Sequence, residues 1–97
     1  MNTQTFSSVW DAIEDTPQQA ANMRARSALM MALEHMITQQ GMTQQEAAQF
    51  LGVTQPRIAD LMRGKINLFS LDALMDMATT AGLLPRMVVE PRNHEAA

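Results

Sequence analysis

The chain has 97 residues, which is enough for one small domain and excludes a two-domain enzyme with a cleft between its domains. It is 46% hydrophobic but only 4% aromatic and has no cysteine, so the core must be mainly aliphatic, and disulfides and cysteine nucleophiles are excluded. The net charge of -3 is uneven, because residues 1–22 and 70–97 are acidic whereas residues 23–69 carry a basic surplus. Any anion-binding face is therefore expected in the middle of the chain.

The sequence has no apolar run of the roughly 18 residues that a membrane span needs. The N-terminus also lacks the basic start and apolar segment of a signal peptide. We therefore expect a cytoplasmic protein that does not associate with a membrane.

The first predicted element is a short helix over about residues 8–15. Ser8 and Asp11 fit a capping box, in which each side chain satisfies a free backbone amide at the start of the helix. Hydrophobic side chains at helical spacing oppose acidic ones, as is typical of an amphipathic helix. Because this helix is too short to be stable alone, residues 1–22 are expected to form an acidic arm.

A long helix is predicted from Pro17 to about Gln40, since Thr16 provides a cap and Pro17 suits the first helical position. Its core stripe is expected to contain Leu29, Leu33, Met36 and Ile37, with Met30 as a further candidate. Gly41 ends it.

Two short helices follow, over residues 44–51 and 55–63. Thr43 and Glu46 form another capping box, and Gly52 ends the first of the two helices. Thr54 caps the second helix and Gly64 ends it.

A fifth helix is predicted from the cap Ser70 to about Ala81, with Gly82 as its stop. Its inward residues are expected to be Leu71, Leu74, Met75 and Ala78. Residues 87–89 (Met-Val-Val) lie between two prolines and predict a short edge strand, which needs a partner strand.

The two short helices around Gly52 fit a helix-turn-helix, which needs small or apolar side chains at the helix crossing and a glycine at the turn. Ala48 is the small residue at the crossing and Gly52 makes the turn. The other buried positions of the pattern are Ala47, Leu51, Val53, Ile58 and Leu61.

On these residues the chain resembles the Xre, or lambda-repressor-like, helix-turn-helix proteins, over about residues 23–83. The resemblance is carried by residues 42–48 (MTQQEAA), 52–55 (GVTQ) and 63–65 (RGK), with Ile58 and Leu61 between them. It implies that Gln44 braces a DNA phosphate and Gln55, and that Gln55 reads a base.

The chemistry of the second short helix agrees with this. Gln55 at its start can pair with the N6 and N7 edge of adenine, Pro56 suits a thymine methyl group, and Arg57 can reach guanine or phosphate. The side chains expected near phosphates are Thr54, Arg63, Lys65 and Asn67. Asp60 would repel phosphate unless it pairs with Arg57 or Arg63 or accepts from a cytosine amino group.

The two ends of the chain give a narrower resemblance to Xre-type antitoxins of the HigA kind, through residues 9–17 (VWDAIEDTP) and a Leu-Pro-x-Met-Val-Val tail. It implies a toxin partner, typically a small basic ribonuclease, and repression of the shared operon. An acidic arm suits a basic enzyme. The candidate partner-binding residues are Phe6, Val9, Trp10, Asp11, Ile13, Glu14 and Asp15.

Several alternatives stay open at this stage. The two short helices could form an ordinary helical hairpin, and the arm could dock on its own bundle or on a dimer mate. Residues 87–89 could pair across a dimer axis or bind a toxin. A regulator without a toxin partner, or an adaptor that binds only proteins, would use the same sequence.

No catalytic constellation or cofactor site is found. His35 and His94 lack neighbours at metal-ligand spacing and are expected on the surface, while the methionines are expected in the core. We thus predict a non-enzymatic, all-α, five-helix, lambda-repressor-like homodimer that binds operator DNA and acts as an antitoxin and autorepressor. Its parts are the arm (1–22), the helix-turn-helix domain (23–84) and a strand with a tail (85–97).

Overall fold

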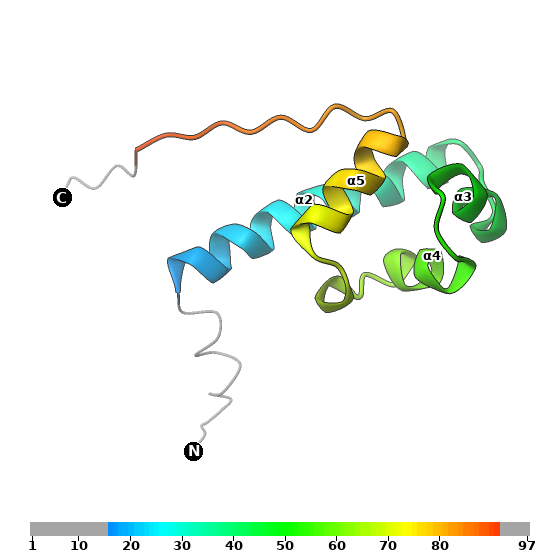
Figure 1. The fold of residues 1–97 in the computed structure, drawn as a ribbon, viewed down its shortest axis with the longest axis horizontal. Coiled ribbons are helices and arrows are strands. Elements are labelled where there is room, and N and C mark those ends of the chain that lie inside the picture. The colour runs from blue at the N-terminus through cyan, green and yellow to red at the C-terminus, as the bar shows by residue number, and fades with distance from the viewer. Residues whose placement is uncertain (1–15, 92–97) are drawn as a thin grey trace, which may run out of the picture.

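The computed structural model describes residues 16–91, which contain four α-helices and one 3-10 turn (Figure 1). The elements are α2 (Pro17–Gln39), α3 (Gln44–Leu51), α4 (Gln55–Met62), η1 (Ile66–Leu68) and α5 (Leu71–Thr80). The all-helical class is confirmed over these residues. The predicted helix over residues 8–15 lies outside them.

Each helix begins at a side-chain cap that the sequence predicts. Thr16, Thr43, Thr54 and Ser70 all accept a hydrogen bond from the backbone amide three residues later. At α3 the capping box is complete, because Glu46 Oε1 also accepts from the Thr43 amide at 2.8 Å. Local chemistry therefore fixes where the helices start.

The core is aliphatic except for one ring. α2 packs mainly against α5, and α3 packs mainly against α4 (Figure 1). Phe69, between η1 and α5, is 1% exposed and is the largest fully buried side chain. The other buried hydrophobic residues are Met30, Leu33, Ile37, Ala47, Ala48, Leu51, Ile58, Leu61, Leu74, Met77 and Ala78.

Two predictions about buried residues need correction. Met75 is 38% exposed, and Met77 is buried in its place. At about 100° per residue the buried residues Met77, Leu74 and Ala78 form a stripe centred close to Leu74, and Met75 lies roughly a third of a turn away from that centre. The methionines as a group are also less buried than expected, because Met31 and Met87 are well exposed.

The first turns of α2 project beyond the other helices (Figure 1). Residues 16–19, 21 and 22 are exposed. The expected boundary between residues 22 and 23 falls inside α2, which is continuous from Pro17 to Gln39.

The segment after α5 does not form the predicted edge strand. Residues 83–91 have neither helix nor strand structure and run back over α5 and α2 (Figure 1). Met87, Val88 and Val89 are 71%, 80% and 83% exposed. The physical reason is that a strand exists only through pairing, and no other segment of residues 16–91 is extended beside it.

Candidate nucleic-acid interface

α3 and α4 pack on each other through the small and apolar side chains that the pattern predicts. Ala47, Ile58 and Leu61 are fully buried, and Ala48 and Leu51 are nearly so. Val53 is partly buried against the same cluster. The close approach of the two helices depends on the small alanine side chains of α3, as a helix-turn-helix crossing requires.

Gly52 makes the turn between α3 and α4. Its φ of 70° lies in the left-handed region, which residues with a Cβ atom adopt only with strain. The next amide, of Val53, donates to the Ala48 carbonyl at 3.0 Å and so closes the end of α3. This turn directs the chain into the cap Thr54 and then into α4.

The two glutamines of the predicted site are the first residues of their helices. Gln44 opens α3 and Gln55 opens α4, and both side chains are exposed. Thr54 and Pro56 are exposed beside Gln55. The N-terminus of α4 therefore offers polar and apolar groups to an external surface and carries the partial positive charge of a helix N-terminus.

Arg57 is held by its own chain. Its Nη1 donates to the Leu68 carbonyl at 2.7 Å, and its guanidinium lies 4.0 Å from the centre of the Phe69 ring. The sequence predicts that this side chain reaches guanine or phosphate. In the free protein this side chain lies against η1 and is half-buried.

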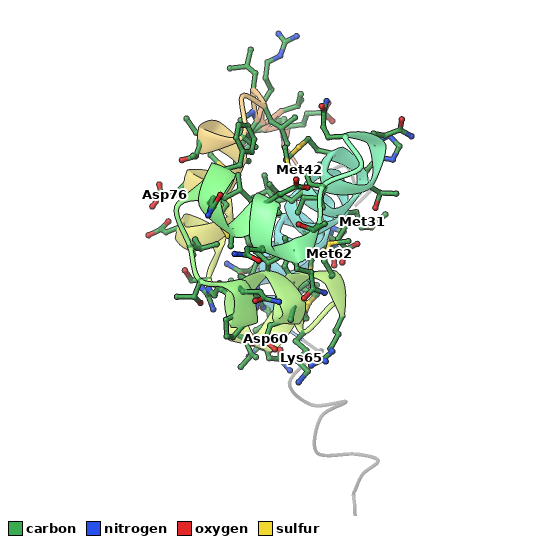
Figure 2. The ribbon with its side chains drawn as sticks, turned by 90° about the vertical axis from the view of Figure 1, so that its right-hand side faces the viewer. Met31, Met42, Asp60, Met62, Lys65 and Asp76 are labelled. Carbon is green, nitrogen blue, oxygen red and sulfur yellow. The ribbon has the colours of Figure 1, made fainter. Side chains whose placement is uncertain are left out.

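Asp60 has a different partner from those that the sequence suggests. Its Oδ1 is 3.8 Å from Lys65 Nζ, and the described structure records no ion pair from it to Arg57 or Arg63. Figure 2 shows both side chains at the same edge of the molecule. Part of the positive charge of Lys65 is thereby offset where a phosphate would approach.

The remaining predicted phosphate contacts, Arg63 and Asn67, are exposed in the segment that follows α4, as is Lys65 between them. The predicted DNA-binding residues thus lie at the start of α3, on α4 and its cap, and in the turn after α4. The predicted partner-binding residues, from Phe6 to Asp15, lie outside the described residues.

Sequence reasoning missed Arg26. Its Nη1 donates from α2 to the Ile66 carbonyl at 3.2 Å and to the Phe69 carbonyl at 3.4 Å. Its Nε is buried and has no hydrogen-bond partner. The sequence does indicate that Arg26 faces inward, because its spacing places it on the same face of α2 as the buried residues Met30, Leu33 and Ile37.

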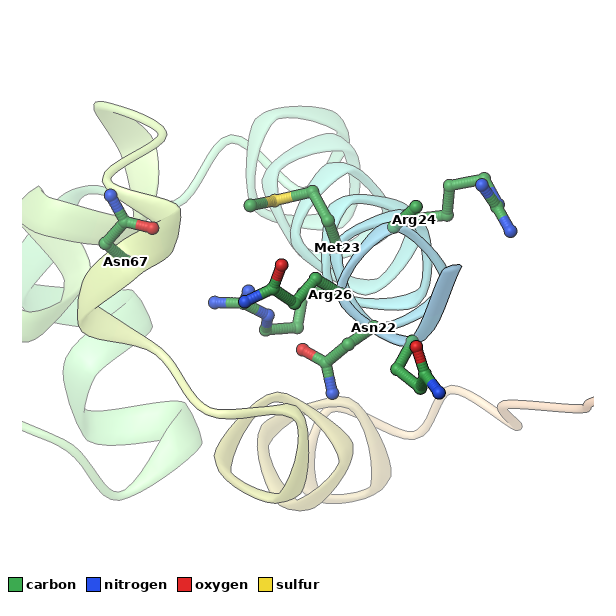
Figure 3. A pocket seen from close by; sticks show the side chains of 8 residues that line it. Asn22, Met23, Arg24, Arg26 and Asn67 are labelled. Atoms are coloured by element: carbon green, nitrogen blue, oxygen red, sulfur yellow. The ribbon is translucent and has the colours of Figure 1, made fainter. Parts of the chain in front are cut away.

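An open pocket of about 710 Å³ lies beside Arg26, between the first half of α2 and Asn67 (Figure 3). Its lining includes Gln18, Asn22 and Met23. The pocket is remote in sequence from α3 and from the start of α4. Asn67 is the one residue of its lining that also belongs to the predicted DNA-binding set.

Over residues 16–91 no helix is both long and apolar enough to cross a bilayer. Comparison with curated proteins gives no match. The family model of the helix-turn-helix domain matches residues 12–90, which include every helix described above. This agrees with the resemblance to Xre-like proteins. With its α3–turn–α4 geometry and this match over most of its length, the chain belongs to the helix-turn-helix domain family, a DNA-binding class.

Proposed function

We propose that the protein is a sequence-specific DNA-binding antitoxin that represses its own operon in the cytoplasm. The DNA-binding part of this proposal rests on the position of Gln55. This side chain is exposed, it is the first residue of α4, and it directly follows the Gly52 turn and the Thr54 cap. That is where a recognition helix presents groups to the edges of bases.

The individual contacts follow from the chemistry of the exposed side chains. Gln55 pairs with adenine in the major groove, and Pro56 contacts a thymine methyl group. Gln44 at the start of α3 contacts a phosphate, as do Thr54, Arg63, Lys65 and Asn67. Asp60 weakens the attraction between Lys65 and phosphate because its carboxylate lies close to Lys65.

We also propose that the protein acts as a homodimer. Few basic side chains are available at the interface, so one protomer gains little from phosphate contacts alone. Two protomers on half-sites about 34 Å apart would roughly double those contacts. The exposed hydrophobic residues 87–89 support the proposal, because pairing with the same segment of a second copy would cover them.

The antitoxin half of the proposal is supported by the N-terminal sequence. Trp10 and Ile13 provide hydrophobic anchors, and Asp11, Glu14 and Asp15 provide negative charge. This combination suits a small basic ribonuclease whose RNA-binding surface it would cover. The family match covers only part of this segment, from residue 12 onward.

The experiment is an affinity purification of the tagged full chain expressed from its native operon, with mass spectrometry of what copurifies. We expect one stoichiometric small basic protein that is lost in the Trp10→Ala/Ile13→Ala variant and retained in the Gln55→Ala control. If wild type retains only itself and DNA, the antitoxin half is contradicted and the protein is a regulator without a toxin partner. If toxin is retained but no DNA is bound specifically, the DNA-binding half is contradicted.

A further inference from the structure

The 3-10 turn η1, which follows α4, is short, and contacts from other helices hold it in place. Within it, the Leu68 amide donates to the Lys65 carbonyl at 3.0 Å, and the Phe69 amide donates to the Ile66 carbonyl at 3.1 Å. A 3-10 turn of three residues contributes little stability of its own. Its conformation must therefore depend on contacts to the rest of the domain.

Two arginines from different helices supply these contacts. Arg57 of α4 donates to the Leu68 carbonyl at 2.7 Å, a short charge-assisted bond, and stacks on Phe69. Arg26 of α2 donates to the Ile66 and Phe69 carbonyls. Figure 3 shows Arg26 extending from α2 toward the turn, whereas Arg24 points away from it.

Two of the proposed phosphate contacts lie in this turn, where Leu68 is exposed as well. Lys65 and Asn67 are exposed, and they alternate with Ile66 and Leu68, of which Ile66 packs against the core. The carbonyls that the arginines hold belong to Ile66, Leu68 and Phe69. Fixing these carbonyls fixes the direction in which Lys65 and Asn67 leave the backbone.

We propose that Arg26 and Arg57, here called the arginine clamp, are positioning residues that hold the Lys65–Asn67 turn against the DNA backbone. Arg57 does not read a base, because reading guanine with its fork would break both its bond to Leu68 and its stacking on Phe69. The inference rests on the proposed DNA binding, but the clamp itself is measurable in the free protein.

The first measurement is amide hydrogen exchange of the full chain without DNA. In Arg57→Ala, the amides of Leu68 and Phe69 should exchange about tenfold faster, since a hydrogen bond from a charged donor is lost. Arg57→Lys should behave like Arg57→Ala, because an ammonium lacks the planar fork and the stacking surface. The matched control is Arg24→Ala, which removes the same charge from an exposed position and should leave both amides unchanged.

The second measurement is DNA affinity as a function of salt, using the duplex that wild type selects from a random pool and a scrambled duplex. Arg57→Ala should weaken binding to both duplexes by a similar factor, about tenfold, with base preference unchanged, because the loosened turn no longer holds Lys65 against a phosphate. Lys65→Ala should lower the slope by about 0.9, the value for one phosphate contact.

The outcomes separate the alternatives. Relaxed preference at one base position in Arg57→Ala would identify a base contact made by Arg57. A slope for Arg57→Ala/Lys65→Ala that is lower by about 0.9 than the slope for Lys65→Ala alone would identify a phosphate contact made by Arg57 itself; either result overturns the proposal. Unchanged exchange at Leu68 and Phe69 also overturns it. If wild type selects no sequence, the proposed DNA recognition fails, and the exchange data still decide whether the clamp holds the turn.

Discussion

Asp60 shows how one side chain can oppose the function of the surface that carries it. It lies on α4 among residues that are proposed to meet DNA, and its nearest cation is Lys65. The separation of 3.8 Å and the partial exposure of both groups make this a weak ion pair. We interpret the Asp60 carboxylate as a group that weakens nonspecific binding to phosphate, and not as one that stabilises the fold.

The Asp60→Asn substitution tests this interpretation. It removes a negative charge near the DNA and leaves Lys65 unpaired, so binding to specific and random duplexes should strengthen alike, by roughly 0.5 kcal/mol at low salt. Fluorescence anisotropy with both duplexes measures the change. Weaker binding to the specific duplex alone would show that Asp60 accepts a hydrogen bond from a base.

At the scale of single residues, the sequence predicts those contacts in which the two partners are close together in the chain. The four caps act over three residues, so their residue types and spacing are sufficient. The contacts of the arginine clamp cross 11 residues for Arg57 and 40 or more for Arg26. Such contacts depend on how α2 and α4 are placed in space, which spacing along the chain does not give.

Among the elements, the turn between α3 and α4 depends most directly on one residue. Gly52 has a φ of 70°, and an added Cβ would meet no atom within 4 Å. The cost of Gly52→Ala is therefore backbone strain alone, and we expect the free energy of unfolding to fall by roughly 1–2 kcal/mol. Urea denaturation followed by circular dichroism measures it. Gly52→Asn should cost less than Gly52→Ala, and equal losses would contradict this explanation.

The capping box at the start of α3 gives a second prediction at this scale. Thr43→Ala removes the acceptor for the Glu46 amide, which is 3.0 Å away, and should lower the free energy of unfolding by about 1 kcal/mol. Thr43→Ser keeps the hydroxyl group and is the control. If both variants unfold at the same urea concentration as wild type, the cap does not stabilise α3.

The boundaries of the four helices within residues 16–91 were predictable to within about one residue, because caps and glycine stops are local signals. Two predictions at this scale were wrong for physical reasons. The hydrophobic pattern predicts Met75 in the core, whereas the buried stripe of α5 passes through Met77. The pattern also predicts a strand over residues 87–89, which have no partner strand among residues 16–91. Hydrophobicity alone does not distinguish a buried methionine from an exposed one, nor a paired strand from an unpaired extended segment.

At the scale of the molecule, the large hydrophobic side chains with the highest exposed fractions among residues 16–91 lie in the C-terminal segment. Leu84, Met87, Val88 and Val89 are each more than two-thirds exposed. Exposed β-branched residues in an extended segment are a template for pairing with another chain. The proposed dimer is the arrangement that covers them.

The dimer proposal predicts that Val88→Lys shifts the protein toward monomer. Two copies of a lysine would approach each other across the paired strands and repel. Sedimentation velocity over a range of protein concentrations measures the shift. Met31→Lys, at an exposed position on α2, is the control and should leave the dimer intact. A Val88→Lys protein as dimeric as wild type would place the interface elsewhere.

The central claim is that Gln55, at the start of α4, reads sequence. Selection from a random duplex pool, followed by sequencing for wild type and Gln55→Ala, tests it most directly. We predict that wild type enriches a two-part site and that Gln55→Ala loses preference at one position of each half-site, at a cost of about 1–3 kcal/mol. Gln49→Ala, at an exposed position on α3, is the control and should select the wild-type site. An unchanged site for Gln55→Ala, or equal loss on specific and random DNA, would contradict the account.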